Sequence, residues 1–248
     1  MPSEEQFKDR AERDMAIACY LALITWMDEN VGRIIDTLER CGLSDTTRVI
    51  YTSDHGDNIG HRGLWGKSNF YLESVAVPLI MAGPGIEPGV CETPVSLIDL
   101  YPTVLAALDV PVPADEAQRP GRSLFALANE RTDHERLVFS QYHAVGSEMA
   151  GYMVRHGRWK YHHYVGYPPE LFDLQDDPQE LNDLGSDPGH QPVVKNMHEV
   201  LLSQCDPQAV DAAAKQRQAE LIAYHGGREQ ALTVGAPAAT PPPGETSA

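Results

Sequence analysis

The chain has 248 residues, of which 42% are hydrophobic and 22% charged, a composition typical of a globular protein of one large domain or somewhat more. Its 36 acidic residues outnumber its 19 Lys and Arg residues, which gives a formal net charge of −17. Such a surface repels phosphate backbones and anionic lipid, so we expect neither a nucleic acid nor a membrane as partner.

Two further features bear on the cellular compartment. The cysteines are far apart and show no CxxC or Cys/His clustering, so they are typical of reduced thiols; they are Cys19, Cys41, Cys91 and Cys205. The N-terminal stretch MPSEEQFKDRAERD has no apolar core, and no apolar run approaches the length of a membrane span. We therefore expect a cytoplasmic protein, provisional on the native N-terminus.

A long amphipathic helix is the first predicted element. Between residues 16 and 38, apolar residues recur at three- and four-residue steps, and Gly42 is placed to end the helix. The segment TRVIYTS, residues 47–53, is short and β-branched, which predicts a buried strand. A helix followed by a buried strand favours an α/β layer with parallel strands.

The next segments predict a second strand and a second helix. Residues 75–83, VAVPLIMAG, have the character of a strand, and Pro78 favours a position near a sheet edge or a bulge. Residues 96–108 predict a helix, with Asp99 as its N-cap and Pro102 in its first turn.

The character of the sequence changes after a proline-rich connector at residues 110–121. Short aromatic segments follow, with a hairpin turn at His156 and Gly157, and they predict a small antiparallel sheet. Helices are predicted around residues 193–202 and 207–224. We divide the chain into part of an α/β core, a small α+β subdomain and a tail that is disordered by composition: residues 1–125, 126–234 and 235–248.

Asp54 and His55 follow the first predicted strand directly. Neighbouring side chains of a strand point to opposite faces, so the pair can hold one ion only if the chain has left strand geometry. Gly56 permits such a departure, since it can take backbone angles closed to other residues. A carboxylate and an imidazole together suit a divalent cation such as Mn²⁺, Ca²⁺, Mg²⁺ or Zn²⁺. The alternative is that Asp54 caps a turn and His55 is a loop residue.

The stretch SDHGDNIGHRGLWGKSNFYLESVAVPLIMAGPG, residues 53–85, resembles the C-terminal metal-binding segment of sulfatases of the alkaline phosphatase superfamily. Within that family it is similar to the branch of choline-sulfatase-like enzymes and phosphonate monoester hydrolases. Blocks on both sides, from the first helix to ELFDLQDDPQELNDL, follow in the family's order. The resemblance implies an α/β fold: part of an alkaline-phosphatase-like doubly wound sheet plus a small C-terminal antiparallel sheet subdomain. It also implies metal-dependent hydrolysis of a small anionic ester.

The resemblance assigns roles to particular residues. Asp54 and His55 would be ligands of one divalent metal, Ca²⁺, Mn²⁺ or Mg²⁺, and Lys67 would contact the sulfate or phosphoryl oxygens. His143 resembles a position near the substrate pocket, although a structural histidine fits the sequence as well. For Tyr161–Tyr164 we prefer packing in a half-exposed strand to a second metal site.

The family's nucleophile is missing from the sequence. Sulfatases attack with a formylglycine made from the cysteine or serine of a C/S-x-P-x-R signature, and no such signature occurs here. Cys91 begins CETPV, with the proline one place late, and Ser186 begins SDPGH, with histidine in place of arginine. The Asp-Asp pair that completes the family's metal site near the N-terminus is absent too.

We therefore expect a truncated sulfatase-family chain that has little or no activity alone. The isolated chain would be marginally stable, or it would pair with a complementary N-terminal half or with another copy of itself. Two alternatives remain open: a non-catalytic fragment, pseudoenzyme or partner subunit that keeps the fold, and a hydrolase of phosphonate or phosphate mono- or diesters from the same superfamily.

Overall fold

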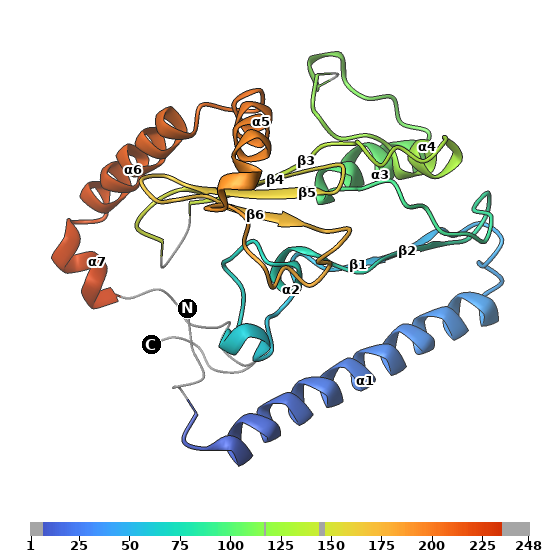
Figure 1. Ribbon diagram of the computed structural model, residues 1–248. Coiled ribbons are helices and arrows are strands. Elements are labelled where there is room, and N and C mark those ends of the chain that lie inside the picture. The colour runs from blue at the N-terminus through green and yellow to red at the C-terminus, as the bar shows by residue number, and fades with distance from the viewer. Residues whose placement is uncertain (1–6, 117, 144–146, 235–248) are drawn as a thin grey trace. The chain divides into compact units, whose positions relative to one another are not determined.

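The computed structural model describes residues 7–116, 118–143 and 147–234, so the tail predicted at residues 235–248 lies outside the described residues (Figure 1). Internal contacts divide the chain into two compact units, Met1–Gln204 and Cys205–Ala248. The domain boundaries drawn from the sequence stay a prediction.

The first unit contains five helices longer than a 3-10 turn and six strands among its described residues. In chain order these are α1 (Arg10–Arg40), β1 (Val49–Thr52), α2 (Leu72–Val75), β2 (Leu79–Ala82), α3 (Leu100–Ala107), α4 (Leu124–Asn129), β3 (Val138–Tyr142), β4 (Gly151–His156), β5 (Trp159–Tyr164), β6 (Glu170–Asp173) and α5 (Gln191–Leu202). The second unit contains α6 (Pro207–Tyr224) and α7 (Arg228–Val234). The helices predicted around residues 193–202 and 207–224 are confirmed as α5 and α6.

Helix α1 confirms the first predicted element and is longer than predicted. The Asp9 side chain accepts a hydrogen bond from the Glu12 backbone N–H and caps its start. Gly42, at φ 67°, ends it as predicted. The backbone N–H groups of Gly42 and Leu43 donate to the carbonyls of Glu39 and Leu38, which is the Schellman arrangement.

Strands β1 and β2 pair with each other antiparallel, with Val49 opposite Ala82, so the expectation of parallel neighbours is wrong for this pair. The connection between them contains a 3-10 turn at His61–Gly63 and the four-residue helix α2 but no longer helix to form a parallel crossover, and the chain returns beside the strand it left. Strand β1 is half-buried and not buried as predicted. Strand β2 is shorter than predicted, because α2 ends at Val75 and β2 begins only after Pro78.

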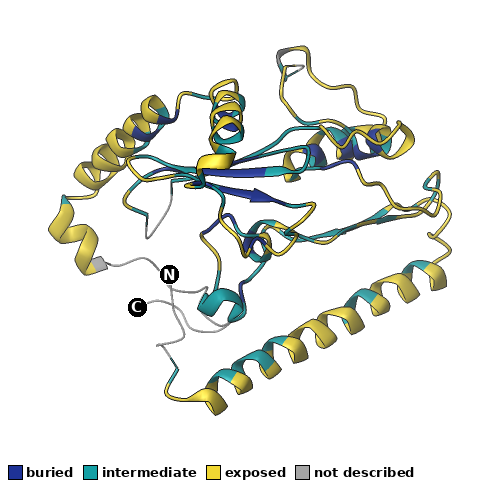
Figure 2. Cartoon of the chain, viewed as in Figure 1, coloured by how far each residue is buried: buried dark blue, intermediate teal, exposed yellow. Residues whose placement is uncertain are grey.

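The second sheet confirms the predicted antiparallel subdomain. Its strand order is β3-β4-β5-β6, and Gly157, at φ 59°, lies in the two-residue turn between β4 and β5. Helix α5 packs on β4 and β5. The sheet and this helix contain most of the fully buried apolar side chains (Figure 2): Tyr152, Val154, Leu171, Met197 and Leu201.

Strand β5 is covered on both faces, so the expectation of a half-exposed strand at Tyr161–Tyr164 is wrong. The Tyr161 and His163 rings face His198 of α5, at centroid distances of 6.2 and 5.3 Å. The His162 ring faces the opposite way and lies 5.6 Å from the Phe70 ring. The sequence could not show this, because Phe70 and α5 are distant in the chain.

Asp99 has a larger structural role than the predicted N-cap. The helix begins one turn earlier, at a 3-10 turn over Leu97–Asp99, where Ser96 and Asp99 form a capping box. The buried Asp99 carboxylate also accepts two hydrogen bonds from the Arg136 guanidinium, at 2.7 and 2.9 Å, and one from the Arg122 backbone N–H. This ion pair ties residues before β3 to the start of α3.

Among the described residues, no helix is both long and apolar enough to cross a bilayer.

Candidate metal and substrate site

Asp54 and His55 follow the end of β1, in a bend where strand geometry has already ended. The Asp54 carboxylate oxygen Oδ2 lies 3.3 Å from Nε2 of His55, so both side chains reach the same point in space. The Asp54 side chain is 82% exposed, whereas that of His55 is 37% exposed. The pair is therefore open to a ligand from solvent.

The orientation of the His55 ring is fixed by the backbone. Its Nδ1 lies 2.9 Å from the carbonyl oxygen of Gly56, and a carbonyl can only accept, so Nδ1 carries the proton. In the neutral ring Nε2 then keeps its lone pair. Nζ of Lys67 lies 2.7 Å from this Nε2 and donates to it. The side chains of Asp54, His55 and Lys67 thus meet at one imidazole nitrogen.

The Asp54 carboxylate is held in its charged form. Its limited desolvation works to raise its pKa, but the imidazole of His55 and hydrogen bonds from the His55 backbone N–H and the Ser53 hydroxyl together lower the pKa below its ordinary value. An ionised carboxylate beside a neutral imidazole lone pair is the donor set that a divalent cation uses.

Gly56 acts through its small size. The sequence predicts that Gly56 takes backbone angles that other residues cannot adopt. This prediction is wrong, because the φ of Gly56 lies outside the left-handed region. A Cβ at this position would lie 2.1 Å from the carbonyl oxygen of Glu73, and the Gly56 N–H donates to the carbonyl of Ser74 at 2.8 Å. The glycine therefore lets α2 approach the chain directly behind the Asp-His pair.

The loop from Asp57 to Gly66 folds back on itself and brings the Lys67 side chain next to the His55 ring. The Asp57 carboxylate accepts hydrogen bonds from the backbone N–H groups of Ile59 and Gly66, and Asn58 bonds the carbonyl of Gly66 through both its backbone and its side chain. Gly63 and Gly66 have φ of 70° and 73°, backbone angles that favour glycine and that turn the loop back on itself.

Arg62 joins this loop to the segment that follows β6. Its guanidinium donates to the carbonyls of Gln179 and Glu180 and lies 4.4 Å above the Tyr71 ring. The buried Glu180 carboxylate accepts from the Lys160 ammonium and, at 2.7 Å, from the Leu72 backbone N–H. Sequence reasoning missed this network, because Arg62 and Glu180 are 118 positions apart.

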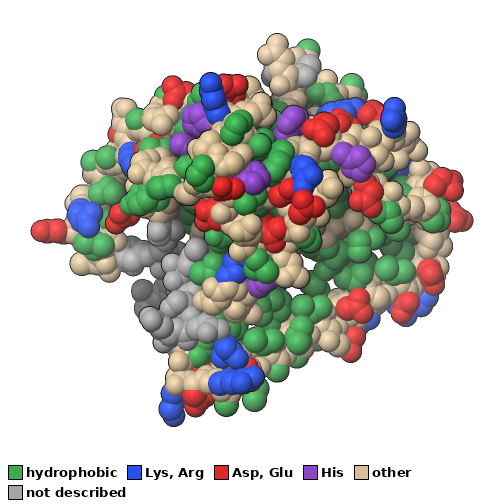
Figure 3. Space-filling view, in the orientation of Figure 1, with side chains coloured by type: hydrophobic (Ala, Val, Ile, Leu, Met, Phe, Trp, Pro, Cys, Tyr) green, Lys and Arg blue, Asp and Glu red, His purple; other side chains and the backbone are tan. Residues whose placement is uncertain are grey.

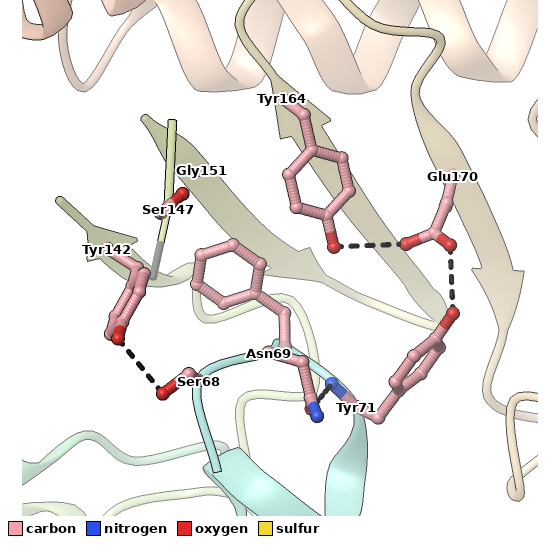
Figure 4. Close-up of a pocket in the computed structure, with 9 residues that line it drawn as sticks. Ser68, Asn69, Tyr71, Tyr142, Ser147, Gly151, Tyr164 and Glu170 are labelled. Carbon is pink, nitrogen blue, oxygen red and sulfur yellow. Dashed lines mark hydrogen bonds between the residues drawn. The ribbon is translucent and has the colours of Figure 1, made fainter. Parts of the chain in front are cut away.

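A pocket of about 280 Å³ opens beside Ser68, the residue after Lys67 (Figure 4). The Ser68 hydroxyl accepts from the Tyr142 hydroxyl at 2.9 Å, and Ser68 has a φ of 79°. The rings of Tyr142, Tyr164 and Tyr71 line the pocket together with the Glu170 carboxylate. The pocket is thus aromatic with one acidic group.

Among the described residues, the Glu170 carboxylate accepts hydrogen bonds from two tyrosines and a histidine. Tyr71 donates at 2.8 Å, Tyr164 at 3.2 Å and Nδ1 of His162 at 2.9 Å. Burial lowers the pKa of His162, which keeps this imidazole neutral. Burial also works to raise the pKa of Glu170, but the three hydrogen bonds outweigh it and lower that pKa. The carboxylate at the pocket wall is therefore ionised.

His143 lies at the end of β3, beside Tyr142. Its Nε2 is 3.3 Å from Oε1 of Gln141, and its ring meets the Tyr152 ring edge-on, with centroids 5.5 Å apart. The described residues that line the pocket do not include His143. Its substrate-binding role stays a prediction, and its contacts here are those of a packed ring.

Asp54 and His55 fit part of a divalent metal site. Two ligand atoms about 2.2 Å from one ion at a right angle lie about 3 Å apart, close to the distance between Oδ2 and Nε2. Over residues 7–116, 118–143 and 147–234, however, no group of three or more His, Cys, Asp or Glu side chains is arranged to hold a metal. The described residues supply two ligands.

Comparison with known proteins gives consistent matches. Residues 2–110 match the family model "Sulfatase", and residues 60–206 match "N-sulphoglucosamine sulphohydrolase, C-terminal". The choline-sulfatase of Rhizobium meliloti is 38% identical over 205 residues, which are 81% of this chain and 40% of that enzyme. Arylsulfatase K of Homo sapiens is 36% identical over 67% of this chain and 33% of its own length.

Two solved structures extend the likeness to the fold. A putative sulfatase from Bacteroides thetaiotaomicron has a TM-score of 0.72 at 27% identity and covers 84% of this chain and 46% of its own. The phosphonate monoester hydrolase of Silicibacter pomeroyi has a TM-score of 0.66 at 30% identity and covers 75% of this chain and 40% of its own. The chain spans less than half the length of these relatives.

Proposed function

The chain belongs to the sulfatase family of the alkaline phosphatase superfamily, and on that premise we propose that its Asp54–His55–Lys67 cluster serves the hydrolysis of sulfate esters. The observation that carries the proposal is the meeting of a carboxylate, an imidazole lone pair and an ammonium at one point after β1.

Asp54 and His55 would hold a divalent metal through Oδ2 and Nε2. When bound, such an ion supplies Lewis-acid polarisation of an ester oxygen. The hydrogen bond from Nδ1 of His55 to the Gly56 carbonyl prepares the ring for this role, because it fixes the tautomer and aims the lone pair.

Lys67 would bind the sulfate group. Its ammonium has three N–H donors, of which Nε2 of His55 takes one in this structure. The remaining donors can hydrogen-bond sulfate oxygens and offset the negative charge that develops on them and on the leaving oxygen. In a chain of net charge −17, this local cation is needed to attract an anionic ester.

The pocket beside Ser68 would hold the alcohol part of the ester. Ser68 follows Lys67 directly, so a substrate whose sulfate lies on the ammonium extends toward the pocket. The tyrosine rings and the ionised Glu170 favour an alcohol that carries a positive charge. The similarity to a choline-sulfatase supports this substrate class.

Phosphonate or phosphate esters are the second candidate substrates. The structural similarity to the phosphonate monoester hydrolases of Silicibacter pomeroyi and Agrobacterium radiobacter, at 30% and 28% identity, supports this alternative. The cluster itself does not discriminate, because sulfate and phosphonate present the same kind of oxygens to a lysine and a metal.

We further propose that these 248 residues alone do not complete the catalytic machinery. They contain no C/S-x-P-x-R signature from which a formylglycine could be made. The described residues also supply only two metal ligands at the cluster. A non-catalytic subunit that binds metal and ester would have the same features.

The test separates binding from turnover. Isothermal titration of the purified chain with Mn²⁺ and with Ca²⁺ should show one site, which Asp54→Asn or His55→Ala weakens at least tenfold. Asp45→Asn, an exposed carboxylate in the turn before β1, is the control and should bind as the wild type does. Absence of a metal site would overturn the proposed cluster.

Turnover is assayed in parallel with p-nitrophenyl sulfate and p-nitrophenyl phenylphosphonate, each with both metals. We expect no release of nitrophenolate above the uncatalysed rate from the 248-residue chain. Turnover at ordinary enzyme rates would overturn the proposal that the machinery is incomplete. The ester that is hydrolysed would then identify the substrate class.

A further inference from the structure

The described part of the chain has an uneven distribution of exposed apolar side chains. Most large hydrophobic residues that are exposed lie between residues 15 and 112. In the same stretch, only Trp65 and Phe70 are hydrophobic residues that are buried. The β3–β6 sheet has a core of its own, whereas the segments around β1 and β2 do not (Figure 2).

Helix α1 shows the imbalance most clearly. None of its 31 residues is buried. The stripe that the sequence predicts to face a core is open to solvent. Its members Ile24, Met27, Ile34 and Ile35 are 41 to 60% exposed. Figure 3 shows hydrophobic side chains gathered along this helix and on the surface next to it.

The adjoining sheet of β1 and β2 also exposes apolar side chains to solvent. Ile80 of β2 is 60% exposed. Strands β1 and β2 pair only with each other among the described residues, so each keeps an edge of backbone N–H and carbonyl groups without a ladder partner. The Tyr51 hydroxyl of β1 donates to Sδ of Met27 at 3.6 Å, which places the helix stripe next to this sheet.

We propose that this surface is a docking face for the part of the sulfatase core that the chain does not match. The face consists of the exposed stripe of α1, Ile80 and the open edges of β1 and β2. The docked polypeptide adds strands to the open edges and covers the stripe with apolar side chains.

Two observations favour this occupant over a second copy of the chain. The chain matches only 40% of the length of the choline-sulfatase and 46% of the Bacteroides thetaiotaomicron structure, so the family fold includes a further segment with no counterpart here. A second copy would bring together two chains of net charge −17, whose repulsion opposes association. Strand addition also explains why open edges and an apolar stripe occur together.

The first arm of the test uses the 248-residue chain alone. Light scattering after size exclusion should give the monomer mass of 27.3 kDa. Hydrogen exchange should be fast across α1 and β1, and the dye ANS should fluoresce on the exposed face. The proposal would be overturned by a monomer in which the amides of α1 exchange slowly. A homodimer in which the α1 amides become protected from exchange would also overturn it, and would identify a second copy as the occupant.

The second arm adds the occupant. The chain is co-expressed with the part of the Rhizobium meliloti choline-sulfatase that lies outside its match to this chain. We expect a 1:1 complex, loss of ANS fluorescence and slowed exchange in α1, β1 and β2. Failure to form the complex, or exchange unchanged in these elements, would overturn the proposal. Neither arm uses metal or turnover, so a failure here differs from a failure of the proposed function.

Matched variants locate the face. Ile34→Glu places a charge in the stripe at a position that is already exposed, so the chain still folds, and the complex should weaken at least tenfold. Ala22→Glu adds the same charge on the other side of α1 and should leave the complex unchanged. Equal effects of the two variants would contradict docking through the stripe.

Discussion

The ammonium nitrogen of Lys67 lies 2.7 Å from Nε2 of His55, the ring nitrogen that would bind a metal. Because Nδ1 is committed to the Gly56 carbonyl, Nε2 has the only lone pair of this ring. If a metal binds here as proposed, it competes with the lysine for one electron pair. Cation binding would then displace Lys67 from His55.

This competition predicts that Lys67→Met binds Mn²⁺ more tightly than the wild type. Removing a positive charge about 4 Å from a divalent ion gains about 2 kcal/mol even in a water-like dielectric, which corresponds to about a thirtyfold lower Kd. Isothermal titration at constant pH measures the change. Lys195→Met, which removes an exposed lysine of α5, is the control and should leave the Kd unchanged. Equal or weaker binding in Lys67→Met would argue against a shared lone pair.

The second prediction concerns the glycine behind the Asp-His pair. Gly56→Ala would place its Cβ 2.1 Å from a backbone oxygen of Glu73, which cannot move without shifting α2. We expect the free energy of unfolding to fall by about 2 kcal/mol, as in overpacked cores. Gly32→Ala is the matched control, because no atom lies within 4 Å of its Cβ and it lies inside α1. There the same change should stabilise the chain by about 0.5–1 kcal/mol.

Urea denaturation followed by circular dichroism measures both variants. The two substitutions add the same methyl group and should move the midpoint in opposite directions. If Gly56→Ala unfolded at the wild-type midpoint, the close approach between Gly56 and α2 would not exist in solution.

Local patterns were sufficient to predict part of this structure. The contact between Asp54 and His55 joins sequence neighbours, and the end of α1 follows from a single glycine, so a short window contains the necessary information. The direction in which β2 pairs with β1 depends on the path of the whole connection. The contacts of Arg62 with Glu180 join residues 118 positions apart, and no periodicity within either segment indicates them.

The third prediction tests the network that anchors the Lys67 loop. Glu180→Gln keeps an acceptor for the Leu72 N–H but leaves the buried Lys160 ammonium without its counter-charge. Burial already lowers the pKa of Lys160, so the uncompensated charge should cost about 3 kcal/mol of unfolding free energy. The double variant Glu180→Gln, Lys160→Met should recover part of this loss.

The exposed pair between Arg122 and Glu130 provides the control. Its carboxylate accepts two hydrogen bonds from one guanidinium nitrogen, at 2.7 and 2.9 Å, and both side chains are about half exposed. Glu130→Gln removes the same charge as Glu180→Gln and should change stability by less than about 1 kcal/mol. Equal losses from the two substitutions would show that burial does not set the cost.

The fourth prediction concerns the dependence of stability on pH. Burial, and next the charge of His198, lower the pKa of His163 in the folded state. The unfolded chain therefore binds this proton first as the pH falls, so folding stability declines below the ordinary histidine pKa of about 6.5. Above that pH both states are neutral at His163, and its contribution to stability is fully present. The midpoint of urea unfolding should accordingly be lower at pH 5.5 than at pH 7.5.

His163→Phe isolates this contribution, because it keeps an aromatic ring between Tyr161 and His198 but removes the titration. The difference in unfolding free energy between the two pH values should become smaller than in the wild type. His134→Phe, at an exposed position, should leave the difference as it is. An unchanged pH dependence in His163→Phe would mean that other groups, such as the buried His162, account for the acid sensitivity of the β3–β6 sheet.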